Sequence, residues 1–357
     1  MPELTLAVGG FRYGGWKSIR VTRSIESLSG SFALDVSDRW SGQEDPWPIA
    51  EEDPCRVDID GTVVIDGYVG KRSLSGSATS RGLSYTGRDR AGALVDCSAL
   101  LSKWTFYNVD IGSFAAMLAK PFGVRVSVQP GLTLARVPKV VVSPGDTVYE
   151  VIKRIAADEG VLVVSDGAGG VTITRSGTAR AESLVEGANI LTASVDYDGD
   201  DRYHRYVIAA QVAGTDDASG EATRIQAEAI DVGVRRTDRV LLIRPDKGYT
   251  VADARRRADW EARIRAARAE TVTISVLGWT QTGGALWPVN ALARVKAPRM
   301  IGVDGDMLIS QVEYSIGDSG QVTQLHLVRP DAFTPEPTVA QVKTSGAAWK
   351  ELAGGAL

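Results

Sequence analysis

The sequence predicts a mainly β protein with α+β insertions, in which two similar small antiparallel β-barrels are accompanied by an α/β domain. Three observations lead to this fold class. Apolar and polar residues alternate over many short runs, which is typical of half-buried strands. Helical spacing of apolar residues is concentrated in residues 97–186 and 250–270. A faint internal repeat relates residues 57–89 to residues 295–331.

The first predicted barrel occupies residues 1–96. Alternating apolar residues appear in 19–36, return in 56–69 and end in 83–89, with no helical period between them. The Asp60-Gly61 pair separates two of these runs and predicts a hairpin, because tight two-residue turns need positive φ. Five or six short strands in so small a segment indicate a barrel or sandwich.

The predicted α/β domain follows, in residues 97–186. A first helix is expected around residues 114–118, and a strand follows at 124–128. Asp146 is the expected N-cap of a second helix that ends at Gly160. A hairpin is expected after it, so this segment should fold as a helix packed on strands.

The second predicted barrel occupies residues 187–333 and contains one long helix, 250–270. Thr250 and Asp253 fit a capping box at its start. One face of this helix carries small apolar residues suited to close packing on a sheet. Most of the remaining surface carries arginines, at positions 255, 256, 257, 263, 265 and 268. Residues 334–357 are rich in Pro, Ala and Gly and are expected to form a loose C-terminal tail.

The composition argues against two broad function classes. The chain has 357 residues and a net charge of −4, so it lacks the positive field that DNA-binding and membrane-surface proteins use. Residues 271–293 are uncharged, but their Gln, Asn, Pro, Thr and Gly content predicts strands and turns. The opening residues do not resemble a secretory signal, so synthesis in the cytoplasm is expected. Cys55 and Cys97 are expected to be buried thiols, with a disulfide between them as the alternative.

Catalytic motifs are weak. Gly317-Asp318-Ser319-Gly320 matches the core of a trypsin-like nucleophile loop, but that chemistry needs a histidine base and a buried aspartate. The two histidines, His204 and His326, lie in contexts unlike the required motif. A polar hairpin turn between two strands explains the tetrapeptide better.

Metal and glycan sites have only partial support. Asp196, Asp198 and Asp200 alternate as at the start of a calcium loop, but the required Gly and Glu are missing, which favours a solvated acidic turn. Carboxylate pairs for glycoside hydrolysis stay open, because their geometry is not visible in sequence. Residues 144–161 resemble a LysM glycan-binding module, and the simpler interpretation is a helix packed on a hairpin.

No nucleotide-binding fingerprint is present, because the glycines at 167, 169 and 170 lie in a predicted hairpin rather than at a strand-to-helix turn. The arginine-rich helix has few interleaved aromatics, so it is interpreted as a solvated or interface face. We therefore expect no catalytic, cofactor-binding or metal-binding residues, no cofactor and no small-molecule substrate.

A series of strings in a characteristic order resembles a known family. They include Gly30-Ser-Phe-Ala-Leu, Trp47-Pro-Ile, Val64-Ile-Asp-Gly-Tyr-Val, Thr86-Gly-Arg-Asp-Arg-Ala-Gly, Gly145-Asp-Thr-Val-Tyr-Glu, Glu186-Gly-Ala-Asn-Ile-Leu, Leu286-Trp-Pro-Val-Asn, Met307-Leu-Ile-Ser-Gln-Val and Arg329-Pro-Asp-Ala-Phe. The chain is similar, over roughly residues 10–333, to the baseplate hub family of phage Mu and its relatives. That family is related in fold to the hub of larger myophages and to the base of type VI secretion spikes.

The resemblance implies a structural, non-enzymatic role in a contractile tail. It implies a homotrimer whose two barrels per chain form a pseudo-sixfold ring that joins the tail tube to a central spike. Other baseplate proteins would be further partners, and DNA would pass through the lumen without specific binding. Assembly in the host cytoplasm and a final place in the virion baseplate follow. Trp279, Trp287 and Asn290 are expected to be packing and turn residues of the second barrel.

Two other functions are carried as alternatives. The LysM-like segment and the scattered tryptophans suggest a peptidoglycan-binding or peptidoglycan-degrading tail component. A secretion-spike base would share the fold and differ in its biological context. The orientation of the arginines in 255–268 and the order of the tail are left open by the sequence.

Overall fold

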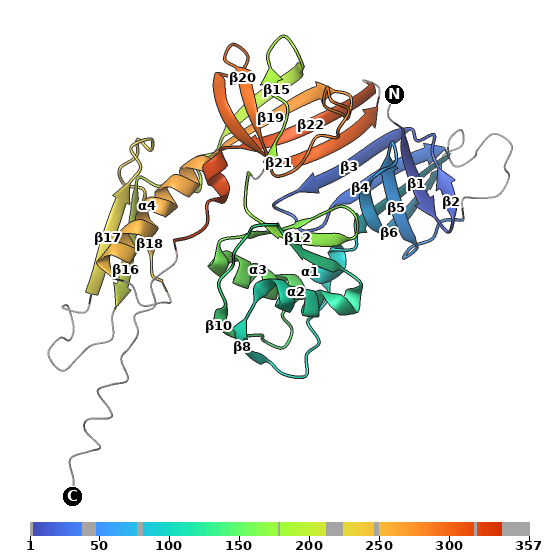
Figure 1. Cartoon of the computed structure of the whole chain (residues 1–357). Coiled ribbons are helices and arrows are strands. Elements are labelled where there is room, and N and C mark those ends of the chain that lie inside the picture. Colours follow the sequence, from blue (N-terminus) through green and yellow to red (C-terminus); the bar gives the residue numbers. More distant parts are fainter. Residues whose placement is uncertain are drawn as a thin grey trace, which may run out of the picture. The chain divides into compact units, whose positions relative to one another are not determined.

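The computed structural model describes residues 3–37, 48–76, 81–177, 179–211, 224–245, 250–317 and 320–337. The chain divides into two compact units, Met1–Asp198 with Ala267–Pro335, and Gly199–Ala266 with Glu336–Leu357. The first unit contains two groups of strands and an α/β segment, and the second contains a three-stranded sheet with one long helix (Figure 1). The protein is therefore mainly β, as predicted.

Five antiparallel strands form what we call the N-module, paired in the order β3-β4-β7-β6-β5. They are β3 (Ser18–Ser24), β4 (Ser31–Ser37), β7 (Arg81–Asp89), β6 (Thr62–Gly76) and β5 (Pro54–Ile59). Beyond β5 the sheet continues into β1 (Leu4–Val8) and β2 (Phe11–Tyr13). The predicted turn is confirmed, because Asp60 and Gly61 have φ of +46° and +77° and connect β5 to β6.

Five further antiparallel strands form the C-module, paired in the order β15-β19-β22-β21-β20. They are β15 (Ile190–Tyr197), β19 (Glu270–Leu277), β22 (Gly320–Val328), β21 (Val303–Gly317) and β20 (Ala291–Ala297). The short strands β13 (Ala179–Arg180) and β14 (Leu184–Val185) pair in parallel with β20. The uncharged stretch 271–293 thus forms strands and turns as predicted, and none of the described helices has the length and apolarity needed to cross a membrane.

The two modules have the same strand order, and their three central strands have the same register. Phe32 pairs with Gly87, and Val272 pairs with Leu327, so adding 240 to both numbers of the first pair gives the second pair (32 + 240 = 272 and 87 + 240 = 327). The long strands β6 and β21 also carry equivalent β-bulges, at residues 70 and 310, against β7 and β22.

The repeat inferred from the sequence is present in this strand order, and its alignment is right at the start and wrong further along. Val57 and Val295, where the two stretches begin, are equivalent, because they pair with Ile65 and Gly305, which the offset of 240 relates. The strings that begin at Val64 and Leu308 occupy the same place in the sequence repeat, whereas the pairing makes Tyr68 the equivalent of Leu308, because Tyr68 pairs with Arg88 and Leu308 with Val328. The error is four residues, an even number. A period-two pattern looks the same after such a shift, so local alternation could not detect it.

The two modules are joined edge to edge. β3 of the N-module pairs with β21 of the C-module, so a single sheet runs through both, and no closed barrel is found among the described strands. The prediction of two separate closed barrels is not supported in that form, because β3 has its second neighbour in the other module. One hydrophobic core runs through both modules and includes Leu34, Ile65, Ile274 and Leu325.

The α/β segment lies between the modules in sequence and has its own core. Its helices are α1 (Gly92–Asp96), α2 (Ile111–Ala119), the 3-10 turn η1 (Lys120–Phe122) and α3 (Val148–Glu159). Its strands are β8 (Thr105–Val109), β9 (Arg125–Val128), β10 (Val137–Val141), β11 (Leu162–Ser165) and β12 (Gly170–Thr174). Thr147 and Glu150 form a capping box at α3, so the expected Asp146 cap is wrong by one residue, and Gly160 ends the helix in the left-handed region as predicted.

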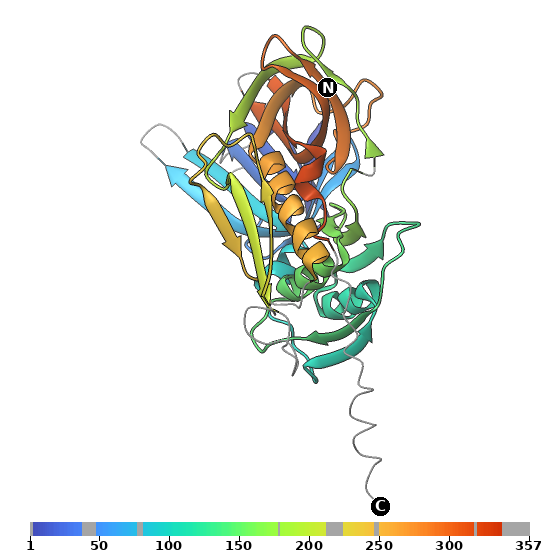
Figure 2. The same cartoon turned by 90° about the vertical axis from the view of Figure 1, so that its left-hand side faces the viewer.

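The second unit packs α4 (Val251–Arg268) on a sheet of β16 (Arg205–Gln211), β17 (Arg224–Ile230) and β18 (Val240–Ile243), as Figure 2 shows. Ala254 and Ala258 are fully buried in this contact, which confirms the predicted small-residue face. Val251, which the helical spacing in the sequence also predicts to lie on that face, is exposed instead. Reciprocal hydrogen bonds between Thr250 and Asp253 confirm the predicted capping box.

Candidate functional site

The predicted motifs resolve into structural features. Gly317 and Gly320 pair at the end of the β21–β22 hairpin, as expected, and residues 318 and 319 lie outside the described part of the chain. His326 lies within β22, where its ring is 3.4 Å from the Thr273 hydroxyl. The His204 ring is 2.8 Å from the backbone oxygen of Val234. Each histidine therefore has a local partner in its own sheet or loop.

The candidate metal ligands and the two cysteines also have simple structural explanations. In the described ranges no group of three or more His, Cys, Asp or Glu side chains could hold a metal ion, and Asp196 lies at the end of β15. Cys55 and Cys97 are both free thiols. Cys55 is buried, which raises the pKa of its thiol to about 12. Cys97 is exposed, so the expectation of two buried thiols is wrong for it.

The LysM-like segment is a helix packed on a hairpin, which was the simpler interpretation. Val148, Val151 and Ile155 of α3 are buried in the α/β core together with Val163 and Ile173 of the β11–β12 hairpin. The apolar face of α3 is therefore used for packing within the α/β segment.

The tryptophans and the asparagine singled out in the C-module have the expected structural roles. Trp279 is completely buried, and its indole N–H donates to the Ser315 carbonyl at 2.9 Å. Trp287 is also buried. Asn290 has φ of +62°, accepts a hydrogen bond from the Gly177 N–H and donates one to the Arg175 carbonyl. It therefore fixes a turn.

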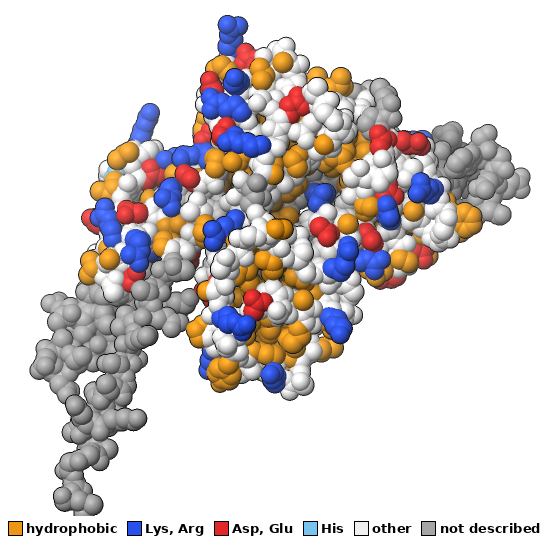
Figure 3. Space-filling view, viewed as in Figure 1, with side chains coloured by type: hydrophobic (Ala, Val, Ile, Leu, Met, Phe, Trp, Pro, Cys, Tyr) orange, Lys and Arg blue, Asp and Glu red, His pale blue; other side chains and the backbone are white. Residues whose placement is uncertain are grey.

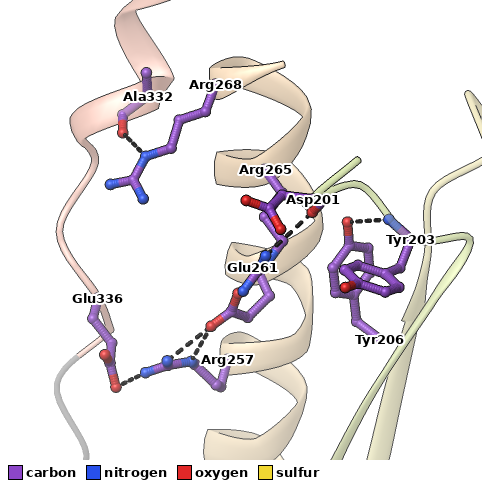
Figure 4. A network of polar contacts seen from close by, with 9 residues as sticks. All are labelled: Asp201, Tyr203, Tyr206, Arg257, Glu261, Arg265, Arg268, Ala332 and Glu336. Atoms are coloured by element: carbon purple, nitrogen blue, oxygen red, sulfur yellow. Dashed lines mark hydrogen bonds and ion pairs between the residues drawn. The ribbon is translucent and has the colours of Figure 1, made fainter. Parts of the chain in front are cut away.

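The arginines of α4 are largely paired within the helix and its surroundings (Figure 4). Arg257 and Arg265 both contact Glu261, at 2.8 and 2.9 Å, and Arg257 also pairs with Glu336. Arg268 donates to the Ala332 carbonyl at 3.0 Å. Local partners thus fix the orientation of these three guanidinium groups.

The junction between the N-module and the C-module joins two strands from distant parts of the sequence. Residues 19–24 of β3 pair antiparallel with residues 311–316 of β21. The Arg20 guanidinium lies 3.2 Å from the Glu313 carboxylate across the junction. Next to it, Tyr314 is buried and its hydroxyl donates to the Trp287 carbonyl at 2.6 Å. Burial raises the pKa of Tyr314 to about 12, so this hydroxyl stays protonated at neutral pH.

A buried carboxylate connects the N-module to the α/β segment. Asp89 is 3% exposed and accepts hydrogen bonds from the Gly30 N–H at 2.8 Å, the Ser165 hydroxyl at 2.6 Å and the Ser29 hydroxyl at 2.9 Å. Burial raises the pKa of Asp89 above 3.8, and these hydrogen bonds partly oppose the rise. The pair Asp89–Ser165 links β7 to β11 and fixes the segment to the strands.

Asp89 gives a testable pH dependence. Because its pKa is raised in the folded chain, the folded state holds its proton more tightly than the unfolded state, and its contribution to stability falls as pH rises from 3.8 toward the raised value. The Asp89→Asn variant has no carboxyl group at this position and therefore lacks this titration. Urea titrations of both chains would measure their free energies of unfolding. We expect the difference, unaltered chain minus Asp89→Asn, to decrease between about pH 4 and pH 7. A constant or increasing difference would contradict the assignment.

A groove of about 640 Å³ lies over the N-module and α1. Its lining includes Phe32 and Gly87 on the strands and the ion pair of Arg88 with Asp96. Asp89, also in the lining, is held by the three hydrogen bonds described above. These charged groups are thus engaged with local partners rather than aimed together at a common point.

The α/β segment exposes several large apolar side chains. Leu100, Tyr107 and Val141 are 91%, 71% and 51% exposed. Figure 3 shows hydrophobic side chains gathered on the face of this segment that is in view. Exposed apolar patches of this kind mark protein–protein contacts more often than reaction sites.

Comparison with known sequence families matches three parts of the chain. Residues 3–89 match the N-terminal domain of Mu phage baseplate assembly protein GpP-like proteins. Residues 91–175 match the second domain of the baseplate hub protein gp44-like family. Residues 250–336 match the fourth domain of Mu phage baseplate assembly protein GpP.

Individual relatives of the chain belong to the same kind of protein as the matched family models. The baseplate hub protein gp44 of Escherichia phage Mu is 31% identical over 338 residues, covering 92% of this chain and 88% of that protein. The solved 43 kDa tail protein of prophage MuSo2 from Shewanella oneidensis has a TM-score of 0.82 and 32% identity, covering 93% of this chain and 99% of that chain. A tail protein from Neisseria meningitidis MC58 shares the fold, with a TM-score of 0.78 and 22% identity, over 94% of this chain and 98% of that one.

A type VI secretion component, the c3393 protein of E. coli, shares the fold more distantly. Its TM-score is 0.54 at 9% identity, covering 94% of this chain and 80% of that chain. The strand modules and the matched domains together define a phage tail protein. The chain belongs to the baseplate hub family of Mu-like phages, and it is a component of the virion baseplate. No catalytic family is among the three that match.

Proposed function

We propose that this chain is the structural hub of a contractile tail, and that three copies form a pseudo-sixfold ring. The observation that carries the proposal is the shared strand order of the N-module and the C-module, in which one offset of 240 relates the central strands β4, β7 and β6 to β19, β22 and β21. Two near-equivalent modules per chain give three chains six near-equivalent positions. A ring of that kind can contact a threefold spike on one side and a sixfold tube on the other.

The partners in this proposal are two further copies of the chain, a central spike protein, and the tail tube or other baseplate proteins. The relative named as a baseplate hub supports these partners. The exposed apolar side chains of the α/β segment are consistent with a protein partner on that face. The proposed division of roles places the ring in residues 1–96 and 187–333, with residues 97–186 as an attached domain and 334–357 as a tail.

The lumen of the ring would pass DNA without binding it. A cargo that slides needs few fixed phosphate contacts, and the net charge of −4 agrees with this. The proposed role uses no cofactor, metal or small-molecule substrate, and catalysis is not part of it. The chain would assemble in the host cytoplasm and remain in the virion.

The first test is the mass of the purified chain in solution. We expect light scattering to give three times the 38.0 kDa of one chain. A matched enzymatic test, incubation with cell-wall sacculi, should release no muropeptides. A chain that stays at the mass of one copy over the whole accessible concentration range would contradict the trimer.

A further inference from the structure

Half of the long strand β6 has one edge without a strand partner. β7 pairs with residues 67–76 on one side, while β5 on the other side stops at Tyr68. Backbone hydrogen bonds from the loop at Glu52 and Asp53 continue that side to Val69. Beyond this point, none of the strands in the described ranges pairs with residues 70–76 on that edge. Open strand edges of this length are normally covered or paired.

The equivalent half of β21 is paired. Residues 311–316, which correspond to residues 71–76 by the offset of 240, form the junction with β3. In that junction Tyr314 lies opposite Val21. The chain therefore already contains one example of how this half-edge is filled.

The strand that corresponds to β3 in the C-module is β15. Val21 pairs with Phe32 and Val195 pairs with Val272, and Phe32 and Val272 are equivalent, so an offset of 174 relates β3 to β15 (21 + 174 = 195). Among the described strands β15 pairs only with β19, which leaves its other edge open. In the described part of the chain, β6 thus has an open half-edge that corresponds to the paired half of β21, and β15 has an open edge that corresponds to the paired edge of β3.

We propose that residues 71–76 of β6 pair antiparallel with residues 193–198 of β15 in a second copy of this chain. The inference rests on the proposed trimer and specifies its interface. Applying both offsets to the β3–β21 junction sets the register: Leu74 lies opposite Val195, and Lys71 lies opposite Asp198.

The chemistry of the two edges is complementary in this register. Lys71 is basic, and Asp196 and Asp198 are acidic, so opposite charges meet at the start of the β6 segment. The neighbouring Arg72 lies 3.6 Å from Glu51 of its own chain. Leu74 and Tyr197 are 63% and 70% exposed in the single chain. Pairing would place Leu74 beside Val195, as Tyr314 lies beside Val21 in the existing junction.

The proposed pairing is also compatible with the symmetry of a closed ring of three chains. Each copy donates its β6 edge to one neighbour and receives the β6 edge of the other neighbour on its β15, so the contact is head to tail. In a closed ring of three, each such contact alternates with a β3–β21 junction, and the open half-edges of β6 and β15 are then paired in every copy.

Disulfides placed by the register test the proposal. In a Cys97→Ser background, we expect the pair Ser75→Cys and Ser194→Cys, or the pair Leu74→Cys and Val195→Cys, to form covalent trimers on mild oxidation. The two pairs are adjacent along the strands, so one is a hydrogen-bonded pair and the other a non-hydrogen-bonded pair of the antiparallel ladder. In both, directly opposite residues have the Cα spacing that a disulfide needs. Mixing the two single-cysteine chains of one pair should give covalent dimers only. The control is Ser75→Cys with Tyr197→Cys, which is three residues out of register and should stay mostly unlinked.

The outcomes separate this interface from the proposed function. A trimer by mass in which neither pair forms, or in which the control forms more readily, overturns the strand pairing and leaves the hub function standing. A chain that stays monomeric overturns both. The unaltered chain provides a second measurement: in trimers assembled from a mixture of isotope-labelled and unlabelled chains, a zero-length carbodiimide should link Lys71 to Asp198 or Asp196 between copies. Links confined to other residue pairs count against the register.

Discussion

Replacing Trp279 by alanine is expected to lower the free energy of unfolding by about 3–5 kcal/mol. The indole is completely buried in the core shared by both modules, and it donates a hydrogen bond to the backbone of Ser315 in β21. The substitution removes a large apolar volume and also leaves the Ser315 carbonyl without this donor. Urea denaturation at a fixed protein concentration would measure the loss, since assembly adds to apparent stability.

Trp104→Ala is the matched control. Its side chain is 37% exposed and lies in the α/β segment, so the same chemical change should cost clearly less than it does at the fully buried Trp279. Equal losses for the two variants would contradict the assignment of Trp279 to a packed core.

Replacing Gly67 by alanine is expected to cost about 3 kcal/mol. A Cβ on Gly67 would lie 1.9 Å from the Arg88 carbonyl oxygen and 2.6 Å from the Cα of Asp89. Both are backbone atoms of the paired strand β7, so neither can move without disturbing the β6–β7 pairing and the hydrogen bonds of Asp89. Thermal and urea unfolding would both report the change.

Gly305→Ala provides the comparison for this prediction. Gly305 also lies inside a paired strand, β21, but a Cβ there meets no atom within 4 Å. Alanine should be neutral or slightly stabilising, within about 0.5 kcal/mol, because it restricts the unfolded chain more than glycine does. If both variants were equally mild, the close approach at Gly67 would be disproved.

Local structure was largely predictable from the sequence. The Asp60-Gly61 turn, the end of α3 at Gly160 and the capping box at Thr250 follow from backbone preferences that act over a few residues. Strand existence followed from alternation in the same way. Trp279 and Trp287 were correctly assigned to packing because large aromatics beside strand patterns are usually buried.

Long-range pairing was not predictable. Nothing in the alternation of residues 19–24 distinguishes a partner in the same module from a partner near residue 314, because both offer an apolar face of period two. For this reason two closed barrels were expected where one sheet joins both modules. The role of Asp89 was also missed, since its donors come from two distant places in the sequence, the adjacent residues Ser29 and Gly30 on one side and Ser165 on the other.

The connection between the first two strands of each module has one further consequence. From β3 to β4 it consists of residues 25–30, whereas from β15 to β19 it consists of residues 198–269, which hold nearly all the described part of the second unit. The strands on either side keep the same register in both cases. The same strand pairs therefore form around a connection of six residues and around one of 72, so the length of chain inserted at this corner does not determine how the flanking strands pair.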